Sequence, residues 1–359
     1  MGSEMNYEIN VELGRIGRTN APEPGWENIS KLDNSMWSEA EKLLGKIVYQ
    51  YGGSSVVVSS DLSVITSWYE HDLTRGKVLR NPQGFSEEIR DSIWLDSEVI
   101  LKCVVKFEGV VKFGDAQQRR AEVLVEKYLY DVFFVMNIAL PGCCEFLNAR
   151  VMANDGFALK YGGAEALHLS SYSFELAHDN YLDGDVFAPR PLCLKDVFDW
   201  YQALNLGVSQ KADTSTARAI FALLHMCKSE ASIATVIWIF HALESIFSTR
   251  IGEGVPGITA RMMFLLDLDS RYQKRLNKGL RELYDCRSAF VHGNYDVHHP
   301  MGNEQLDERL DDDRGDMYRV CSFGFNLIVL SLQNLISKGW VGLTVAESVV
   351  GVSITKSSE

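Results

Sequence analysis

Arg287 and His292 are separated by four residues in the segment Leu283–Gly293, and their side chains could do chemistry together. An imidazole titrates near neutral pH, so a histidine can act as a general acid or a general base. A guanidinium carries a fixed charge in a planar fork that matches the oxygens of a phosphate. This pair could cleave RNA without a metal: the histidine would move protons at the 2′-hydroxyl and the leaving oxygen, while the arginine stabilises the developing negative charge.

The spacing of apolar residues predicts one long helix that begins near Ser270 and runs into this motif. One stripe of this helix is apolar and would pack into the protein. A second stripe, which we name the basic ridge, consists of Lys274, Lys278 and Arg281. At 3.6 residues per turn, the same side of the helix continues through Asp285, Ser288 and His292. A phosphate backbone lying on the basic ridge would therefore be drawn toward His292.

Arg287 does not belong to the basic ridge. It precedes His292 by five positions, which in a straight helix places the two side chains more than a quarter of a turn apart. We therefore expect either a break in the helix before His292 or a site that a second subunit completes.

Three further side chains could support the pair. Glu244 interrupts an apolar segment, where it would either orient Arg287 by a hydrogen bond or form an ion pair with another basic residue. Tyr284 could be a core aromatic residue or a platform on which an RNA base stacks. Asp285 could position Arg281 or His292, or simply continue the exposed face of the helix.

A longer pattern surrounds these residues. It consists of Ala242–Phe247, Ile258, Arg261, Leu265, Leu266 and Leu283–Gly293. In these residues the C-terminal part of the chain resembles the HEPN superfamily of helical-bundle ribonucleases, specifically the Apea-like HEPN domain. The resemblance implies a homodimer in which two Arg-x4-His motifs face one cleft. It also implies endoribonuclease activity that needs no metal or other cofactor, often in toxin or anti-phage systems.

One position departs from the family. Many members carry Asn, Asp or His directly after the arginine, where this chain has Ser288. A serine can still orient the arginine or a phosphate, so the resemblance keeps Ser288 as a supporting residue. Some members are inactive modules for binding or dimerisation, and that alternative stays open.

The pattern of the whole chain predicts an α+β fold, in which a mixed, strand-rich domain precedes an all-α bundle of HEPN type. The expected domains are a sensor or regulatory domain in residues 1–200, the bundle in residues 201–345 and a flexible tail in residues 346–359. Residues 1–30 are expected to be irregular, and residues 294–316 to form a polar loop. The predicted strands are Ser55–Ser59, Leu62–Trp68, Glu98–Phe107, Glu145–Met152 and Leu167–Glu175. The predicted helices, besides the long one, are Asn34–Gly45, Ala121–Leu140, Leu194–Leu204, Asp213–Lys228, Ser229–Thr249, Ile258–Leu266 and Met317–Ser337.

Composition narrows the class of protein. The net charge of −13 argues against indiscriminate binding of nucleic acid, although residues 206–344 hold 15 basic and 16 acidic residues and could carry a local basic surface. Seven cysteines without framework spacing suggest a reducing compartment, and no apolar stretch is expected to span a membrane. Nucleotide-binding and serine-hydrolase motifs are missing, and the histidines near Asp296 match no zinc pattern. We therefore expect a cytoplasmic protein without a metal site.

The leading hypothesis is a metal-independent endoribonuclease with Arg287 and His292 as catalytic residues and RNA as substrate. The N-terminal domain would respond to a phage-derived trigger or bind a regulatory partner. One alternative is a non-catalytic HEPN module that only dimerises or binds a partner. The other is a toxin that a partner protein keeps silent.

Overall fold

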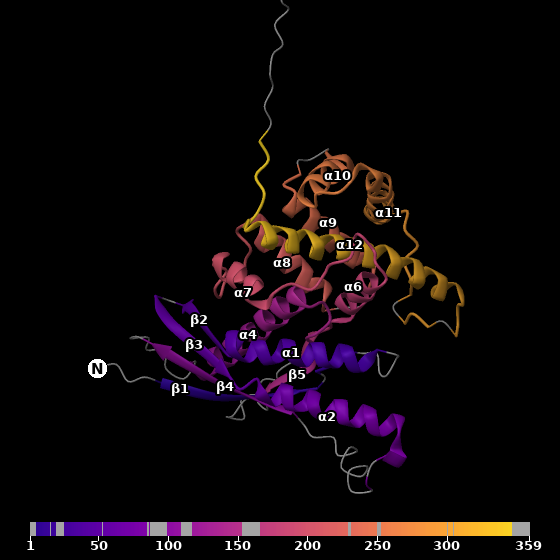
Figure 1. The fold of residues 1–359 in the computed structure, drawn as a ribbon. Coiled ribbons are helices and arrows are strands. Elements are labelled where there is room, and N and C mark those ends of the chain that lie inside the picture. Colours follow the sequence, from indigo (N-terminus) through magenta and orange to yellow (C-terminus); the bar gives the residue numbers. More distant parts are fainter. Residues whose placement is uncertain are drawn as a thin grey trace, which may run out of the picture.

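The computed structural model describes residues 5–14, 16–18, 25–51, 53–84, 86, 99–108, 117–152, 166–228, 231–249, 253–299, 301–303 and 305–346. These residues form a mixed α+β structure in which a curled antiparallel sheet and its helices precede a second group of helices (Figure 1). The strands are β1 (Met5–Leu13), β2 (Lys46–Tyr51), β3 (Ser54–Ser60), β4 (Val99–Glu108), β5 (Phe146–Met152) and β6 (Leu167–Leu169). The helices before residue 200 begin with α1 (Trp26–Leu44), α2 (Ser63–Arg80) and α4 (Gln117–Ala139) and end with α6 (Tyr172–Leu182) and α7 (Leu194–Ala203). The later helices are α8 (Ser215–Met226), α9 (Ile233–Ile246), α10 (Gly254–Leu265), α11 (Gln273–Val291) and α12 (Arg309–Lys338).

The strands pair in the order β2-β3-β4-β1-β5-β6, and every neighbouring pair is antiparallel. Strand β1 lies inside the sheet between β4 and β5, so the prediction of an irregular leader over residues 1–30 is wrong. The signal for this strand was present: Ile9, Val11 and Leu13 are buried and alternate with Glu8 and more exposed polar residues. Such alternation is what a strand with one face on the core requires.

Two predicted strands are wholly or partly helical instead. The segment Leu62–Trp68 opens α2, whose buried residues include Ile65 and Tyr69 at a spacing of one helical turn. Its β-branched and aromatic residues favour a strand locally, and packing against α1 overrides that preference. In the segment Leu167–Glu175 only the first three residues form a strand, and α6 begins at Tyr172.

Helix α4 joins the two halves of the molecule. Sixteen of its 23 residues are buried, as expected of a helix that is covered on all sides. It contacts strands of the sheet as well as α7 and α12, and Figure 1 shows it between them. The buried apolar side chains described on the sheet and on the later helices accordingly form one continuous core.

The predicted helices after residue 194 are confirmed, with Thr214 as the cap of α8: its hydroxyl accepts a hydrogen bond from the Ala217 amide at 3.1 Å. Helix α12 begins at Arg309, so the predicted polar loop over residues 294–316 is too long. Acidic side chains favour this earlier start: Asp311 and Asp312 lie in the first turn, where their negative charge stabilises the positive end of the helix dipole. The predicted tail falls almost entirely outside the described residues.

Helix α12 is the central element of the helical half and crosses it in Figure 1. Within the described part of the chain it is the one helix long and apolar enough to cross a membrane. However, 72% of its most apolar window is buried inside the protein. A buried core helix of a folded protein can have the same length and composition as a membrane-spanning helix, so these two properties alone are weak evidence for a membrane span.

Candidate active site on helix α11

Helix α11 carries the Arg-x4-His motif on an uninterrupted helix. It runs to Val291, His292 is its C-cap, and Gly293 follows with a φ of 73°. The Gly293 amide donates to the Phe290 carbonyl at 3.2 Å and the Asn294 amide to the Ala289 carbonyl at 2.8 Å. These two bonds form a Schellman motif, for which glycine is favoured because it has no Cβ to strain a positive φ. A helix break between Arg287 and His292 is therefore ruled out.

The regular helix keeps the two motif residues apart. Five helical residues correspond to about 7.5 Å of rise and leave the side chains about 140° apart around the axis. His292 is exposed, and its imidazole has no hydrogen bond or ion pair within the described residues. Ser288 is half-buried, and its carbonyl oxygen accepts a 3.0 Å hydrogen bond from the His292 amide.

Arg287 faces helix α9. Its Nη1 lies 3.4 Å from Oε1 of Glu244, and its guanidinium carbon lies 5.3 Å from the ring centroid of Phe240. Tyr284 packs edge-on against the same ring at 6.0 Å and remains 42% exposed. The Arg287 and Glu244 side chains are 34% and 37% exposed, so their ion pair is weak and leaves the guanidinium open to a ligand.

The basic ridge lies on a different side of α11, along an open groove of about 960 Å³. Lys274 and Arg281 have no carboxylate partner among the described residues, whereas Nζ of Lys278 lies 3.8 Å from Glu282. Five basic and two acidic side chains line the groove: Arg271, Lys274, Arg275, Lys278, Arg281, Glu282 and Asp285. Such a surface can follow the phosphates of a nucleic acid.

The nine residues predicted for the site thus form two groups. The basic ridge and Asp285 line the groove, whereas Arg287, Tyr284 and Glu244 gather around Phe240. His292 and Ser288 lie at the end of the helix in register with the basic ridge. Within the described residues neither forms a side-chain hydrogen bond or ion pair with Arg287.

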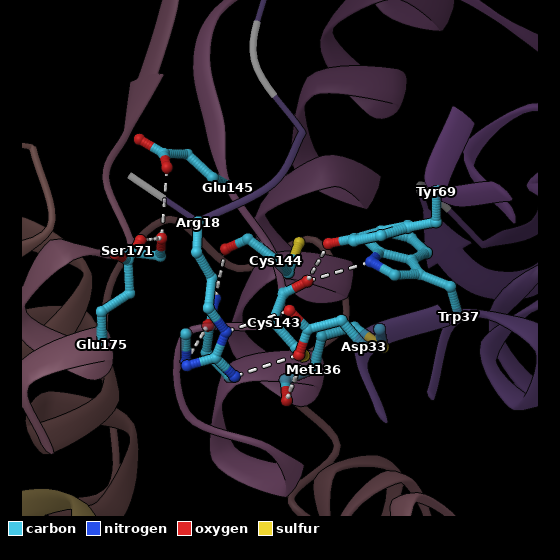
Figure 2. Close-up of polar contacts among 12 residues, drawn as sticks. Arg18, Asp33, Trp37, Tyr69, Met136, Cys143, Cys144, Glu145, Ser171 and Glu175 are labelled. Atoms are coloured by element: carbon cyan, nitrogen blue, oxygen red, sulfur yellow. Dashed lines mark hydrogen bonds and ion pairs between the residues drawn. The ribbon is translucent and has the colours of Figure 1, made fainter. Parts of the chain in front are cut away.

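A buried polar cluster, which the sequence-based predictions missed, lies where the sheet meets α6 (Figure 2). We call it the polar junction and define it as Arg18, Asp33, Glu145, Ser171 and Glu175. Arg18 and Asp33 form two bonds of 3.0 Å with side chains only 10% and 2% exposed. The Ser171 hydroxyl lies 2.7 Å from Glu175 and 3.3 Å from Glu145.

The polar junction ties elements that are distant in sequence. Gly142, in the turn after α4, has a φ of 85°, and a Cβ there would come within 2.9 Å of Arg18 and 2.8 Å of Glu175. In the first turn of α6, three residues after Ser171, Phe174 packs against Phe325 of α12 with ring centroids 4.8 Å apart. The junction therefore connects the sheet, through α6, to the helix that organises the C-terminal half.

His178 of α6 gives a testable pH dependence. It is 2% exposed, and its Nδ1 has no hydrogen-bond partner in the described structure. Burial, and secondarily the charge of Arg18, lower the pKa of His178 from 6.5 to about 4. Between these two pH values the unfolded chain binds a proton that the folded protein excludes, so stability is lost as the pH falls. We expect this loss to reach up to about 3 kcal/mol.

Urea denaturation of the wild type and of His178→Gln at pH 7 and pH 4.5 measures this contribution. The variant should lose less stability on acidification, because glutamine does not titrate and the carboxylates common to both proteins cancel in the comparison. Equal losses in the two proteins would contradict the assignment.

No family model, curated protein or solved structure matches the chain. Among the described residues, no group of three or more His, Cys, Asp or Glu side chains is arranged to hold a metal ion. What the candidate site can do therefore follows from its own side chains: an imidazole with no partner in the described part of the chain, a weakly paired guanidinium and a row of cations.

Proposed function

We propose that this chain is a metal-independent endoribonuclease of HEPN type, with Arg287 and His292 as its catalytic residues. The observation that carries the proposal is the position of His292. Its unpartnered imidazole stands at the exposed end of α11, in helical register with Lys274 and Arg281, which have no carboxylate partner among the described residues. RNA held along the basic ridge would reach that imidazole, and the sequence resemblance supports the same chemistry.

In the reaction, one His292 imidazole takes the proton of a 2′-hydroxyl, whose oxygen attacks the adjacent phosphorus. The bond to the 5′-oxygen breaks, and an imidazolium donates a proton to that leaving oxygen. The products are a 2′,3′-cyclic phosphate and a 5′-hydroxyl. Arg287 stabilises the charge that develops on the phosphorane oxygens.

A second copy of the chain completes the site. One straight α11 directs Arg287 and His292 to different sides, so the arginine of one protomer would act with the histidine of its partner. Large apolar side chains that are 40–76% exposed cluster in sequence at the end of α11 and just after it. We name these five residues, Phe290, Val291, Val297, Met301 and Leu306, the apolar rim. Exposed apolar residues of this kind, near a site that one chain leaves incomplete, favour an interface between copies.

The test is cleavage of total RNA and tRNA by the purified protein in EDTA. We expect the wild type and a His299→Ala control to cleave, and His292→Ala to be inactive. His299 is an exposed histidine outside the motif, so its loss should not matter. Equal cleavage by wild type and His292→Ala would overturn the proposal, and so would inhibition of the wild type by EDTA.

The basic ridge gives a separate prediction about binding. We expect Lys274→Gln with Arg281→Gln to weaken RNA binding at all sequences alike, because these side chains contact phosphates. Two contacts to a single strand also contribute about 1.4 to the slope of log affinity against log salt concentration, and the double variant should lose this amount. Fluorescence anisotropy across a salt series measures the slope. Lys195→Gln with Lys211→Gln, away from α11, is the matched control, and an equal loss of slope in that control would contradict the assignment.

The apolar rim also suits the second candidate, a HEPN module that dimerises without catalysis. In that case Arg287→Ala would disturb assembly and leave toxicity in a bacterial host unchanged. A ribonuclease would instead be toxic to its host, and replacement of His292 would remove that toxicity. Toxicity that appears only when a neighbouring gene is removed would identify a toxin silenced by its partner.

We expect a phage-derived trigger or a regulatory partner to bind the N-terminal half of the chain.

A further inference from the structure

A cavity of about 380 Å³ opens between α11 and α12 beside the basic ridge. Its lining includes the exposed residues Arg275, Lys278 and Arg319, whose edge of the cavity we call the mouth, and the more buried residues Ser322, Phe323 and Asn326. Arg275 and Lys278 line both this cavity and the groove of the basic ridge. A strand that follows the groove therefore passes the mouth of the cavity.

Asn326 supplies an unused polar group. Its side chain is 2% exposed, and Oδ1 is buried with no hydrogen-bond partner in the described structure. Buried polar atoms in folded proteins are nearly always paired, so an orphan amide oxygen on a residue that lines a cavity indicates a missing partner. The χ2 angle of asparagine is broadly distributed, so a rotation about χ2 can turn the amide toward a bound molecule.

Phe323 supplies an apolar surface next to this amide. A Cβ at Gly279 would come within 2.2 Å of the Phe323 ring, so glycine at this position of α11 lets the two helices approach closely around the aromatic side chain. An apolar ring beside an amide suits a planar heterocycle whose edge forms hydrogen bonds.

The cations at the mouth are held by surface carboxylates. Arg275 Nη2 lies 2.6 Å from Asp185, and Arg319 Nη1 lies 2.8 Å from Glu282. The side chains of Arg275 and Arg319 are 54% and 61% exposed, and ion pairs at such sites are weak. A phosphate can therefore replace a carboxylate at the mouth at little cost.

We propose that this cavity binds one adenine base of the RNA strand, with Asn326 as the specificity-determining residue. An asparagine amide accepts a hydrogen bond from the adenine 6-amino group and donates one to the neighbouring ring nitrogen. Arg275 and Lys278 would contact the flanking phosphates. Lys278 precedes His292 by 14 residues, about 21 Å along a helix, so the adenine lies several nucleotides from the cleaved bond. The inference rests on the proposed function, because it deepens the substrate choice of the same site.

The test uses 5′-labelled octamers of adenosine, uridine and cytidine in which every sugar is 2′-O-methylated. These strands cannot be cleaved through a 2′-hydroxyl, so binding is measured independently of catalysis. Fluorescence anisotropy with the full chain should show the adenosine octamer binding about 10-fold tighter than the other two. Asn326→Leu should lower adenosine affinity by that factor and leave uridine affinity unchanged, while Asn334→Leu, which lies elsewhere on α12, should keep the preference.

Several outcomes overturn the inference: equal affinity of the wild type for all three octamers, a preference for cytidine or uridine, or a preference for adenosine that survives Asn326→Leu. The wild-type preference does not depend on how well a variant folds. RNA cleavage without an adenine preference would leave the proposed function standing and remove the cavity's role. If Asn326→Leu abolishes an adenine preference in a protein that cleaves no RNA, the cavity's role stands and the proposed ribonuclease function falls.

Discussion

Replacing His292 with alanine is expected to lower the rate of RNA cleavage by about 10²- to 10⁴-fold, the contribution of a general acid or base. Arg287→Ala should be similarly damaging, because it removes the charge that would face the phosphorane oxygens in the proposed reaction. Both side chains are at least partly exposed, and the one ion pair that they form within the described structure, from Arg287 to Glu244, is weak, so neither substitution should unfold the protein. Single-turnover cleavage of a labelled RNA measures the rates, and unchanged thermal unfolding supplies the control.

Mixing the two inactive variants tests whether the site is shared. If Arg287 of one protomer acts with His292 of its partner, a mixed dimer contains one intact site. Random exchange makes about half of the dimers mixed, each with one of two sites intact, so about a quarter of the wild-type activity should return. A site built within one chain would give no recovery. Mutating Val291 to Glu in the apolar rim should abolish the recovery by blocking assembly, since the side chain is 62% exposed and has no role in folding that the structure reveals.

Asp33→Asn is expected to lower the free energy of unfolding by about 3–5 kcal/mol, which is a large part of the total for most domains. The substitution leaves the guanidinium of Arg18 in the polar junction without the carboxylate that holds it in two 3.0 Å bonds. Burial alone would disfavour the charge, and the attraction of Asp33 is what raises the pKa of Arg18 above its ordinary value. Urea denaturation at pH 7 measures the change.

Two controls make this prediction specific. Asp199→Asn removes an exposed carboxylate that pairs with Lys195, and should change stability by less than about 1 kcal/mol. The double variant Arg18→Met with Asp33→Leu removes both charges and should recover much of the loss, because apolar residues of similar volume can replace a buried ion pair. A small effect of Asp33→Asn alone, or a double variant less stable than either single variant, would contradict the role of the junction.

The predictions that succeeded for the fold depended on local patterns. Helices such as α4 and α9 carry long apolar faces that dictate both their secondary structure and their burial. The failures were short or ambiguous segments: Leu62–Trp68 has strand-forming residues but packs as a helix, and β1 is a central strand whose partners lie about 90 and 140 residues away. The alternation in β1 could have identified it as a strand, but no local pattern identifies partners that distant.

The polar junction marks the same limit for functional residues. Asp33 occupies the buried stripe of α1 together with Trp37 and Ala40, and a carboxylate on an apolar stripe indicates a buried partner. That pattern could have revealed that Asp33 is paired. It could not have named Arg18 or the cluster on α6, because only the folded chain brings α1, the turn after α4 and α6 together.

For the candidate site, the sequence by itself determined the helix α11, the basic ridge and the offset between Arg287 and His292, since each follows from 3.6 residues per turn. The tertiary structure decided the rest. It set Arg287 against Phe240 and Glu244 and opened a cavity around Asn326. These features arise where one helix meets others, so they depend on contacts between residues far apart in the chain and not on any local repeat.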